Sequence, residues 1–283
     1  MNVTHFSDPE AFYKCVEPYL LPTEAEHNLT FGLLSNIRQH PERFPDAVMV
    51  VVEDQGALQL VALRTDAAHH LILSKAQSLD AIAPLADDLF KAGVVLTGCN
   101  GMNAESERFA ETWARLNGCT YRINTPMRTF KLEHVNPVAG VSGRLRRATP
   151  ADRDLLAAWE LAFMREAFAE QEHRAEDAAR AVDANLNAET AGIFVWDDGG
   201  VVSYTAYKGP TPHGIRIGPV YTPPTLRGHG YASACVAGVS QYLLDYGYQF
   251  CFLFTDLRNP TSNHIYQVIG YEAVADFTEY MFE

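Results

Sequence analysis

A turn with two glycines and an arginine, Arg227-Gly228-His229-Gly230, lies between an expected strand and an expected helix that begins near Tyr231. The first amides of a helix have no intrahelical acceptor, and the helix dipole places partial positive charge beside them. Glycines lack the Cβ atoms that would keep an anion away, and arginine can bond a phosphate through two parallel N–H groups. We therefore interpret this turn as a cradle for a pyrophosphate group.

The turn does not have either of two better-known phosphate-binding patterns. No Gly-Lys-Ser/Thr follows it, so it is not a Walker P-loop. Ser233 stands where a dinucleotide-binding fingerprint has its third glycine. A glycine turn with a solvent-facing arginine is the alternative interpretation, and a second motif is needed to decide between the two.

A second group of polar residues accompanies the last expected helix, Pro260–Ile269. Asn259 precedes this helix, and Asn263 and Tyr266 follow at positions that share one of its faces. Amides and a phenol along one face can hydrogen-bond an elongated ligand. The alternatives are that Asn259 and Pro260 form an ordinary N-cap pair, and that Tyr266 is a core aromatic.

The elements that must position both motifs follow from the second half of the chain. Thr149, Pro150 and Asp152 start a helix that reaches about Phe168. Further helices are expected over 175–188 and 231–246, and strands over 193–196, 201–207, 215–221, 249–255 and 271–282. The stretch Ile215–Thr255 is therefore a strand–helix–strand crossover, and ligands of such units bind beyond the carboxyl ends of the strands. The arginine–glycine turn lies at that end.

The first half has a similar order of elements. Strands are expected over 48–52, 58–64, 70–73, 94–97 and 119–132, and helices over 79–91 and 104–117. The interval from Gly93 to Gly118 is close to the interval from Gly247 to Gly270. We therefore expect two copies of one module, with coincidence of common elements as the alternative. Glu133–Gly143, which contains proline and glycines, is the expected linker.

Composition excludes several classes of function. The chain of 283 residues has 35 Asp and Glu against 22 Lys and Arg, a net charge of −13, which argues against nucleic-acid binding. Its five cysteines include no Cys-x-x-Cys pair, which argues against disulfides and a cysteine zinc site and favours a reducing, cytoplasmic location. The sequence shows no signal peptide, no membrane span and no metal-ligating histidine and carboxylate spacing.

At the two motifs the sequence resembles the GCN5-related N-acetyltransferase (GNAT) superfamily. The family's cofactor signature, Arg/Gln-x-x-Gly-x-Gly/Ala, is matched by the run from Arg227 to Ala232. A later family pattern, Asn-x-x-Ala/Ser-x-x-Leu/Ile-Tyr-x-x-x-Gly-Phe/Tyr, is matched by Asn259, Ser262, Ile265, Tyr266, Gly270 and Tyr271. The resemblance covers residues 144–283.

The resemblance implies an α+β fold of two tandem modules, each a mixed, largely antiparallel sheet flanked by helices. It implies that residues 144–283 form a catalytic domain, an N-acetyltransferase that moves an acetyl or other short acyl group from acetyl-CoA to a primary amine of a small molecule. The coenzyme would lie between the strands 215–221 and 249–255, and no metal is implied. The monomer and the homodimer both remain open, and neither a nucleic acid nor a membrane is an expected partner.

The resemblance also implies roles for individual residues. Tyr266 would donate a proton to the leaving thiolate, and Asn259 would contact the pantetheine region, with Asn263 on the same helix face. The pantetheine arm would pair with the backbone of Val220, Tyr221 and Thr222. Arg227 would hold the pyrophosphate together with the amides of Gly228, His229, Gly230, Tyr231, Ala232 and Ser233.

The general base is where this sequence departs from the family. Many relatives carry a glutamate on the strand before the cradle, but Ile215–Tyr221 contains no carboxylate. Water or another group must take the proton of the acceptor, and the candidates are Glu166, Glu170, Glu172, His173, Tyr204 and Tyr221. An acyl-CoA-binding regulatory or sensor protein without turnover is therefore the alternative function, and a nucleotide-binding α/β protein is a third.

The first module lacks the residues of both motifs. If Gly118 is aligned with Gly270, Ala114 takes the position of Tyr266 and Glu107 takes that of Asn259. The turn before its first crossover helix, Ser74–Ser78, contains no glycine. We therefore expect residues 1–138 to be a degenerate module without a cofactor, which packs against the catalytic half and shapes the acceptor pocket.

Overall fold

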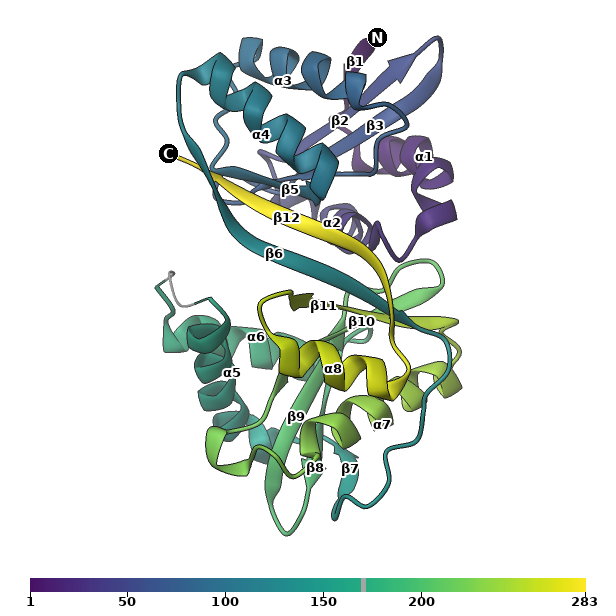
Figure 1. Cartoon of the computed structure of the whole chain (residues 1–283), viewed down its shortest axis with the longest axis vertical. Coiled ribbons are helices and arrows are strands. Elements are labelled where there is room, and N and C mark those ends of the chain that lie inside the picture. The colour runs from purple at the N-terminus through teal and green to yellow at the C-terminus, as the bar shows by residue number, and fades with distance from the viewer. Residues whose placement is uncertain (169–171) are drawn as a thin grey trace. The chain divides into compact units, whose positions relative to one another are not determined.

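The computed structural model describes residues 1–168 and 172–283, and the chain forms two compact units (Figure 1). Unit 1 consists of Met1–Thr129, Phe254–Pro260 and Ala273–Glu283, and unit 2 consists of Phe130–Leu253 and Thr261–Glu272. This division differs from domain ranges of 1–138 and 144–283. The reason is that the last strand, β12 (Glu272–Phe282), pairs antiparallel with β5 (Gly98–Met102) and so completes the sheet of unit 1.

Unit 1 is a mixed sheet with helices on both faces. Its strands lie in the order β1-β2-β3-β4-β5-β12-β6, where the remaining bounds are β1 Asn2–His5, β2 Val48–Asp54, β3 Ala57–Arg64, β4 Leu71–Leu73 and β6 Tyr121–Leu132. The helices are α1 Pro9–Leu20, α2 Asn28–Gln39, α3 Ile82–Lys91 and α4 Asn103–Asn117. Side chains alternate along β2, so that Val50 and Val52 pack with α3 and α4, whereas Met49 and Val51 pack with α1 and α2.

The expected strand over residues 94–97 is wrong, because the strand in this region is β5, Gly98–Met102. Its sequence, Gly-Cys-Asn-Gly-Met, has low strand propensity. Close packing selects it instead. A Cβ atom at Gly98 would lie 2.3 Å from the carbonyl oxygen of Tyr280, and one at Gly101 would lie 3.0 Å from the Cβ of Leu73. Here the contacts between strands that are distant in the sequence outweigh local preference.

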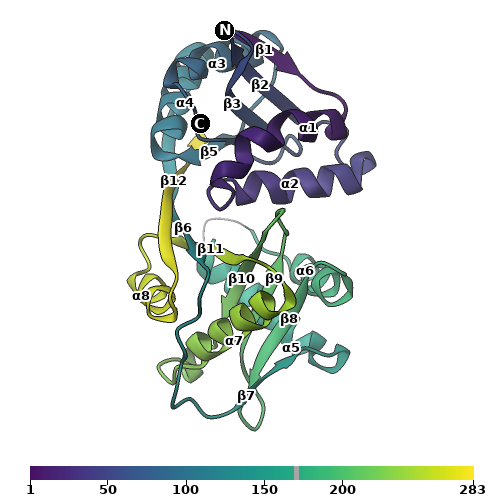
Figure 2. The same cartoon turned by 90° about the vertical axis from the view of Figure 1, so that its right-hand side faces the viewer.

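Unit 2 is also a mixed sheet between two layers of helices (Figure 2). Its strand order is β11-β10-β9-β8-β7, with bounds β7 Arg144–Arg147, β8 Gly192–Asp197, β9 Val201–Lys208, β10 Gly214–Tyr221 and β11 Phe250–Asp256. Its helices are α5 Arg153–Ala167, α6 Ala175–Asn187, α7 Tyr231–Tyr246 and α8 Pro260–Ile269. Helices α5 and α6 pack on one face through Leu156 and Val182, whereas α7 packs on the other through Val236 and Val239.

The element order of the C-terminal half matches that of the N-terminal half. Both read strand, two helices, three strands, helix, strand, helix, strand, running from β1 to β6 and again from β7 to β12. In each copy two strands pair in parallel around a crossover helix: β4 with β5 around α3, and β10 with β11 around α7. The prediction of two tandem α+β modules is confirmed.

The start of α5 is held by a buried carboxylate. Asp152 accepts hydrogen bonds from the backbone nitrogen of Thr149 at 2.8 Å and from both terminal nitrogens of Arg146 at 2.8 Å. The hydrogen bonds from Arg146 hold the pKa of Asp152 well below its usual range. Arg146 lies on β7, so this carboxylate joins the edge strand to the helix that covers the sheet.

We expect Asp152→Ala to lower the free energy of unfolding by about 2 kcal/mol, because it removes a helix cap and leaves Arg146 without its buried partner. Since the pKa of Asp152 is lowered in the folded state, this stability is present above about pH 4 and is lost as the pH falls through the lowered pKa. Urea unfolding at neutral pH measures the difference. Asp154→Ala is the matched control, because the side chain of Asp154 is 93% exposed on the same helix. Equal stability of the two variants would contradict the prediction.

Candidate functional site

The strands β10 and β11 pair over a short stretch and then separate. Parallel pairing joins Gly214–Arg216 to Phe250–Phe252, and the pairing ends at Arg216. On its other side, β10 continues to pair with β9 as far as Tyr221, with a bulge between Ile217 and Val220. Beyond Arg216, therefore, one edge of β10 is free of a paired strand within the described part of the chain, and its backbone groups can pair with an extended ligand.

The side chains of the three residues predicted to line this edge are engaged within unit 2. Val220 packs against the core shared with α7. The Tyr221 hydroxyl donates a hydrogen bond to Glu166 at 3.1 Å, and the Thr222 hydroxyl donates one to Ser203 at 2.9 Å. Any contribution of these residues to ligand binding must therefore come chiefly from their backbone.

The backbone of the predicted cradle depends on its glycines. Gly228 and Gly230 have φ angles of +83° and +82°, in the left-handed region that favours glycine. A Cβ atom at Gly230 would lie 2.8 Å from Cγ2 of Val141, so a larger residue would have to displace that side chain. Ala234 donates its amide to Gly230 at 2.9 Å as the first backbone bond of α7. The amides that precede Ala234 are at the positive end of the helix dipole and have no intrahelical acceptor.

Two side chains of the cradle are held by their neighbours. The rings of His229 and Tyr231 stack at 5.6 Å, and the Tyr231 hydroxyl donates a hydrogen bond to Asp198 at 2.8 Å. Tyr231 is thereby fastened to the turn between β8 and β9, which secures the first turn of α7. Ala232 and Ser233 follow on the same turn of the helix.

Arg227 is held in place by its neighbours. Its Nε donates to the carbonyl oxygen of Thr222 at 2.8 Å, and its Nη2 donates to Glu166 at 2.6 Å. The side chain remains about half exposed, at 48%. A phosphate at the cradle would thus meet a guanidinium that is already oriented by the backbone, and it would compete with the Glu166 carboxylate for one of its N–H groups.

The second motif is distributed over the beginning and middle of α8. Asn259 belongs to unit 1, where its backbone N–H donates a hydrogen bond to the carbonyl oxygen of Asp256 at 3.0 Å. Asn263 and Tyr266 belong to unit 2, the unit that contains the cradle. Tyr266 is partly buried and packs against the same core as Val220. Its ring lies 6.2 Å from that of Phe130 and 5.9 Å from that of Tyr271.

Burial raises the pKa of Tyr266 to about 12, so that the phenol keeps its proton at neutral pH. It can therefore donate a hydrogen bond or a proton, but it cannot act as a base there. A thiolate that leaves into the same apolar surroundings would also have a raised pKa, because burial disfavours every anion. The pKa of the donor phenol and the pKa of the leaving thiol are therefore both raised, so that they stay close to each other.

The candidates for the general base are placed in different environments. Glu166 is engaged with Arg227 and Tyr221, Glu172 is exposed, and a ring nitrogen of His173 bonds the carbonyl oxygen of Phe168 at 2.7 Å. Glu170 lies outside the described residues. Burial raises the pKa of Tyr204 well above its ordinary value and raises that of Tyr221, which makes either phenol a poor base near neutral pH.

One carboxylate beside the candidate bases was not predicted. Glu160 on α5 is buried, accepts a hydrogen bond from the Tyr204 hydroxyl, and has a pKa raised by burial. A signal was present in the sequence. Glu160 is four residues after Leu156, a core residue, so the acid stands on the apolar face of the helix.

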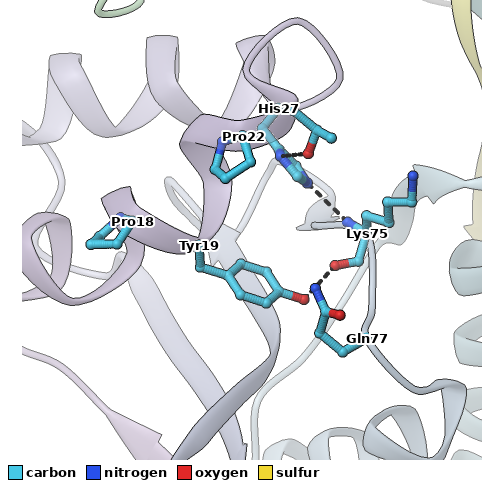
Figure 3. A pocket seen from close by; sticks show the side chains of 7 residues that line it. Pro18, Tyr19, Pro22, His27, Lys75 and Gln77 are labelled. Atoms are coloured by element: carbon cyan, nitrogen blue, oxygen red, sulfur yellow. Dashed lines mark hydrogen bonds between the residues drawn. The ribbon is translucent and has the colours of Figure 1, made fainter.

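A separate pocket of about 350 Å³ lies in unit 1, at the loop after α1 (Figure 3). Its polar groups bond one another: His27 accepts a hydrogen bond from the amide of Lys75 at 3.1 Å, and the Tyr19 hydroxyl donates to the carbonyl oxygen of Lys75 at 2.6 Å. Burial lowers the pKa of His27 to about 4, so that the ring is neutral. These bonds tie α1 and α2 to the segment after β4, which is a structural role.

Two kinds of feature are absent from the described residues, a metal-binding cluster and a membrane-spanning helix. No group of three or more His, Cys, Asp or Glu side chains could hold a metal ion. No helix has the length and apolar character that a bilayer span requires.

Comparison with solved structures supports the fold. Three solved structures are similar over most of the chain. An acetyltransferase of the GNAT family from Colwellia psychrerythraea has a TM-score of 0.58 at 9% identity, with 100% of both chains covered. A Drosophila protein has a TM-score of 0.64 at 12% identity, covering 99% of this chain and 97% of the other. A tandem GNAT protein of the clavulanic acid biosynthesis pathway has a TM-score of 0.52 at 14% identity, covering 84% of this chain and 82% of the other.

Among curated proteins, none matches the chain significantly. The family model described as "Acetyltransferase (GNAT) family" matches residues 153–271, a range that includes the cradle, Arg227 and Tyr266. Residues 153–271 therefore resemble the acetyltransferase domains of the GNAT family.

Proposed function

We propose that this protein transfers an acetyl or other short acyl group from acetyl-CoA to a primary amine of a small molecule, by direct attack of the amine in a ternary complex. The observation that carries the proposal is the glycine turn that opens α7. It presents unbonded helix amides beside an oriented arginine, at the carboxyl end of a strand whose pairing with β11 stops at Arg216. This combination suits a long ligand with an anionic end.

The residues at the turn and along β10 fit the parts of coenzyme A. The amides from Gly228 to Ser233 and the side chain of Arg227 would hold the pyrophosphate. The free edge of β10 at Val220–Thr222 would pair with the amides of the pantetheine arm, as an added strand does. Asn259 and Asn263 would contact the pantetheine from α8. The left-handed φ of Gly230 and the nearby Val141 side chain both favour glycine at this point of the turn.

The reaction forms a bond from the amine nitrogen to the acyl carbon and breaks the bond from that carbon to sulfur. In this proposal Tyr266 gives its proton to the departing thiolate, because its raised pKa keeps it protonated. The acceptor must lose a proton before or during its attack. Since β10 has no carboxylate, this proton leaves to water or to a group on another element.

A thiol-release assay with acetyl-CoA and a panel of primary amines tests the proposal. We expect amine-dependent release of free CoA above the rate without amine. In a thermal melt we expect CoA to raise the melting temperature, whereas ATP and NAD do not. Stabilisation by CoA without turnover on any amine would instead favour an acyl-CoA sensor. Stabilisation by ATP or NAD alone would favour a nucleotide-binding protein.

The N-terminal module has a different role in this proposal. When Gly118 is aligned with Gly270, Ala114 and Glu107 on α4 take the positions of Tyr266 on α8 and of Asn259, which precedes α8. We infer that this module binds no coenzyme and serves the catalytic module structurally. A cytoplasmic location and a monomeric or dimeric state complete the proposal.

A further inference from the structure

Two cations face each other across neighbouring strands of unit 2. Lys208 on β9 and Arg216 on β10 are direct partners in the antiparallel register. Residues in such a pair point to the same face of the sheet, with Cβ atoms about 5 Å apart. Tyr204 and Ala206 lie four and two residues before Lys208 and pack with α5 and α6, so the pair lies on the same face as those helices.

The positive charge of this pair is incompletely balanced. Both residues are partly buried, and this burial lowers the pKa of each. Lys208 is acted on by the repulsion of Arg216 and by the attraction of one buried carboxylate, Glu160. Within residues 1–168 and 172–283, neither cation forms an ion pair, and Glu160 instead accepts its hydrogen bond from Tyr204. Like charges placed directly opposite each other destabilise a sheet.

The position of the pair relates it to the proposed coenzyme. Arg216 is the last residue of β10 that pairs with β11. With the pyrophosphate at the Gly228–Ser233 turn and the pantetheine along Val220–Thr222, the thioester would extend back along β10 toward Arg216. The cations would then border the acyl group on the face covered by α5 and α6, where an acceptor could approach it.

We propose that Arg216 and Lys208 bind a carboxylate of the acceptor, so that the amine is acetylated on a molecule that also carries an acid group, as an amino acid does. Arg216 offers parallel N–H groups that match a carboxylate, and Lys208 adds a point charge. The bound carboxylate would supply the negative charge that balances the two cations. This inference rests on the proposed function and names the class of its substrate.

Matched acceptors test the inference in the intact protein. We expect amino acids to be acetylated with kcat/KM about tenfold or more above that of their carboxamides, because the amide loses a charge-assisted contact. Two such pairs are glycine with glycinamide and phenylalanine with phenylalaninamide. A third pair, an ω-amino acid with its amide, tests acceptors in which the acid and the amine lie farther apart. If the amide in every pair had the same kcat/KM as the matching acid, the inference would be overturned.

The variant Arg216→Gln should remove the preference by raising KM for the acids about tenfold, while the amides and the affinity for CoA stay unchanged. Arg216→Lys, which keeps the charge, should retain part of the preference. Arg180→Gln is the matched control, because Arg180 is an exposed arginine on α6. An unchanged preference in Arg216→Gln would overturn the inference.

A binding measurement separates the inference from the proposed function. The product-like N-acetyl amino acids, added with CoA, should raise the melting temperature of the wild type more than that of Arg216→Gln. If no amine supports turnover, the proposed function fails, and this shift alone decides whether the pair binds a carboxylate. Without ligand, Arg216→Gln and Lys208→Gln should melt at or above the wild-type temperature, since each relieves a repulsion. A lower melting temperature in both variants would show that the two cations stabilise the folded protein, and it would overturn the inference.

A final experiment identifies whether the carboxylate bound by Arg216 and Lys208 belongs to the acceptor or to the acyl donor. Succinyl-CoA has a carboxylate at the end of its acyl chain, and it is offered with an amine that lacks an acid group. Loss of succinyl transfer in Arg216→Gln, with no change in preference among acceptors, would place the anion on the donor and contradict the proposal. Unchanged succinyl transfer together with a lost acceptor preference supports it.

Discussion

Tyr266→Phe is expected to lower kcat about 100-fold, while the dissociation constant for CoA stays within about twofold, because the variant removes one proton donor and keeps the packing of the ring. The ring of Tyr266 rests against Phe130 and Tyr271, and phenylalanine preserves both contacts. Single-turnover thiol release measures the rate, and isothermal titration with CoA measures the affinity. Unchanged kcat would show that Tyr266 is not the proton donor.

The neighbouring phenol provides a matched control. The Tyr271 hydroxyl lies 2.8 Å from the Ser240 hydroxyl in the core of unit 2. Tyr271→Phe should cost about 1 kcal/mol of stability and leave the rate of acyl transfer unchanged. If both variants lost activity equally, a general effect on the packing of α8 would explain the result, and the assignment of Tyr266 would be wrong.

The raised pKa of Tyr266 has a consequence for the pH profile. A proton donor acts only while it is protonated, and with a pKa of about 12 Tyr266 stays protonated throughout the usual assay range. We therefore expect the rate to rise with pH as the acceptor amine loses its proton, with no fall from Tyr266 up to about pH 10. A descending limb near pH 8 that is absent in Tyr266→Phe would contradict this placement of the phenol.

Arg227→Glu is the second change with a large expected effect, and it should weaken CoA binding by about 2 kcal/mol, or about 30-fold in the dissociation constant. The substituted carboxylate would stand beside the pyrophosphate and repel it. Dephospho-CoA, which retains the pyrophosphate but lacks the 3′-phosphate, should lose affinity by a similar factor. Unchanged affinity in the variant would refute the cradle.

The ion pair between Arg227 and Glu166 allows a control in the opposite direction. Glu166→Gln removes the carboxylate that competes with phosphate for the guanidinium, which is placed by its bond to Thr222. CoA should bind this variant as tightly as the wild type or more tightly. Weaker binding to Glu166→Gln would mean that the ion pair orients Arg227 for the ligand, and that the competition argument is wrong.

Local signals were sufficient to predict most of unit 2. The helix over Tyr231–Tyr246 begins after Gly230 and ends before Gly247, as expected, because glycine marks both of its ends. The helix over Pro260–Ile269 is bounded in the same way by Asn259 and Gly270. Near the N-terminus, Asp8 before Pro9 caps α1 by accepting the amide of Glu10 at 2.9 Å, a recognisable start that drew no prediction.

What escaped prediction depends on contacts between distant residues. The bond from Arg227 to Glu166 joins positions 61 residues apart, and no local pattern indicates it. The register that sets Lys208 opposite Arg216 depends on the loop between β9 and β10, and further along the same strands a bulge shifts it. The exchange of β12 into unit 1 likewise follows from strand pairing and not from composition. The place of the glycine turn at the start of α7 was therefore predictable, whereas the charges around it required the structure.

The pairing of β12 with β5 has a consequence for how the protein is made. Strand partners such as Cys99 and Tyr280 are separated by most of the chain. A growing polypeptide usually folds its leading domain first, while later residues are still being added. Here the leading module can acquire its own helices during synthesis, but its sheet is completed only after β12, near residue 280, has been made. Deleting residues of β12 should therefore destabilise a module whose other elements were synthesised more than a hundred residues earlier.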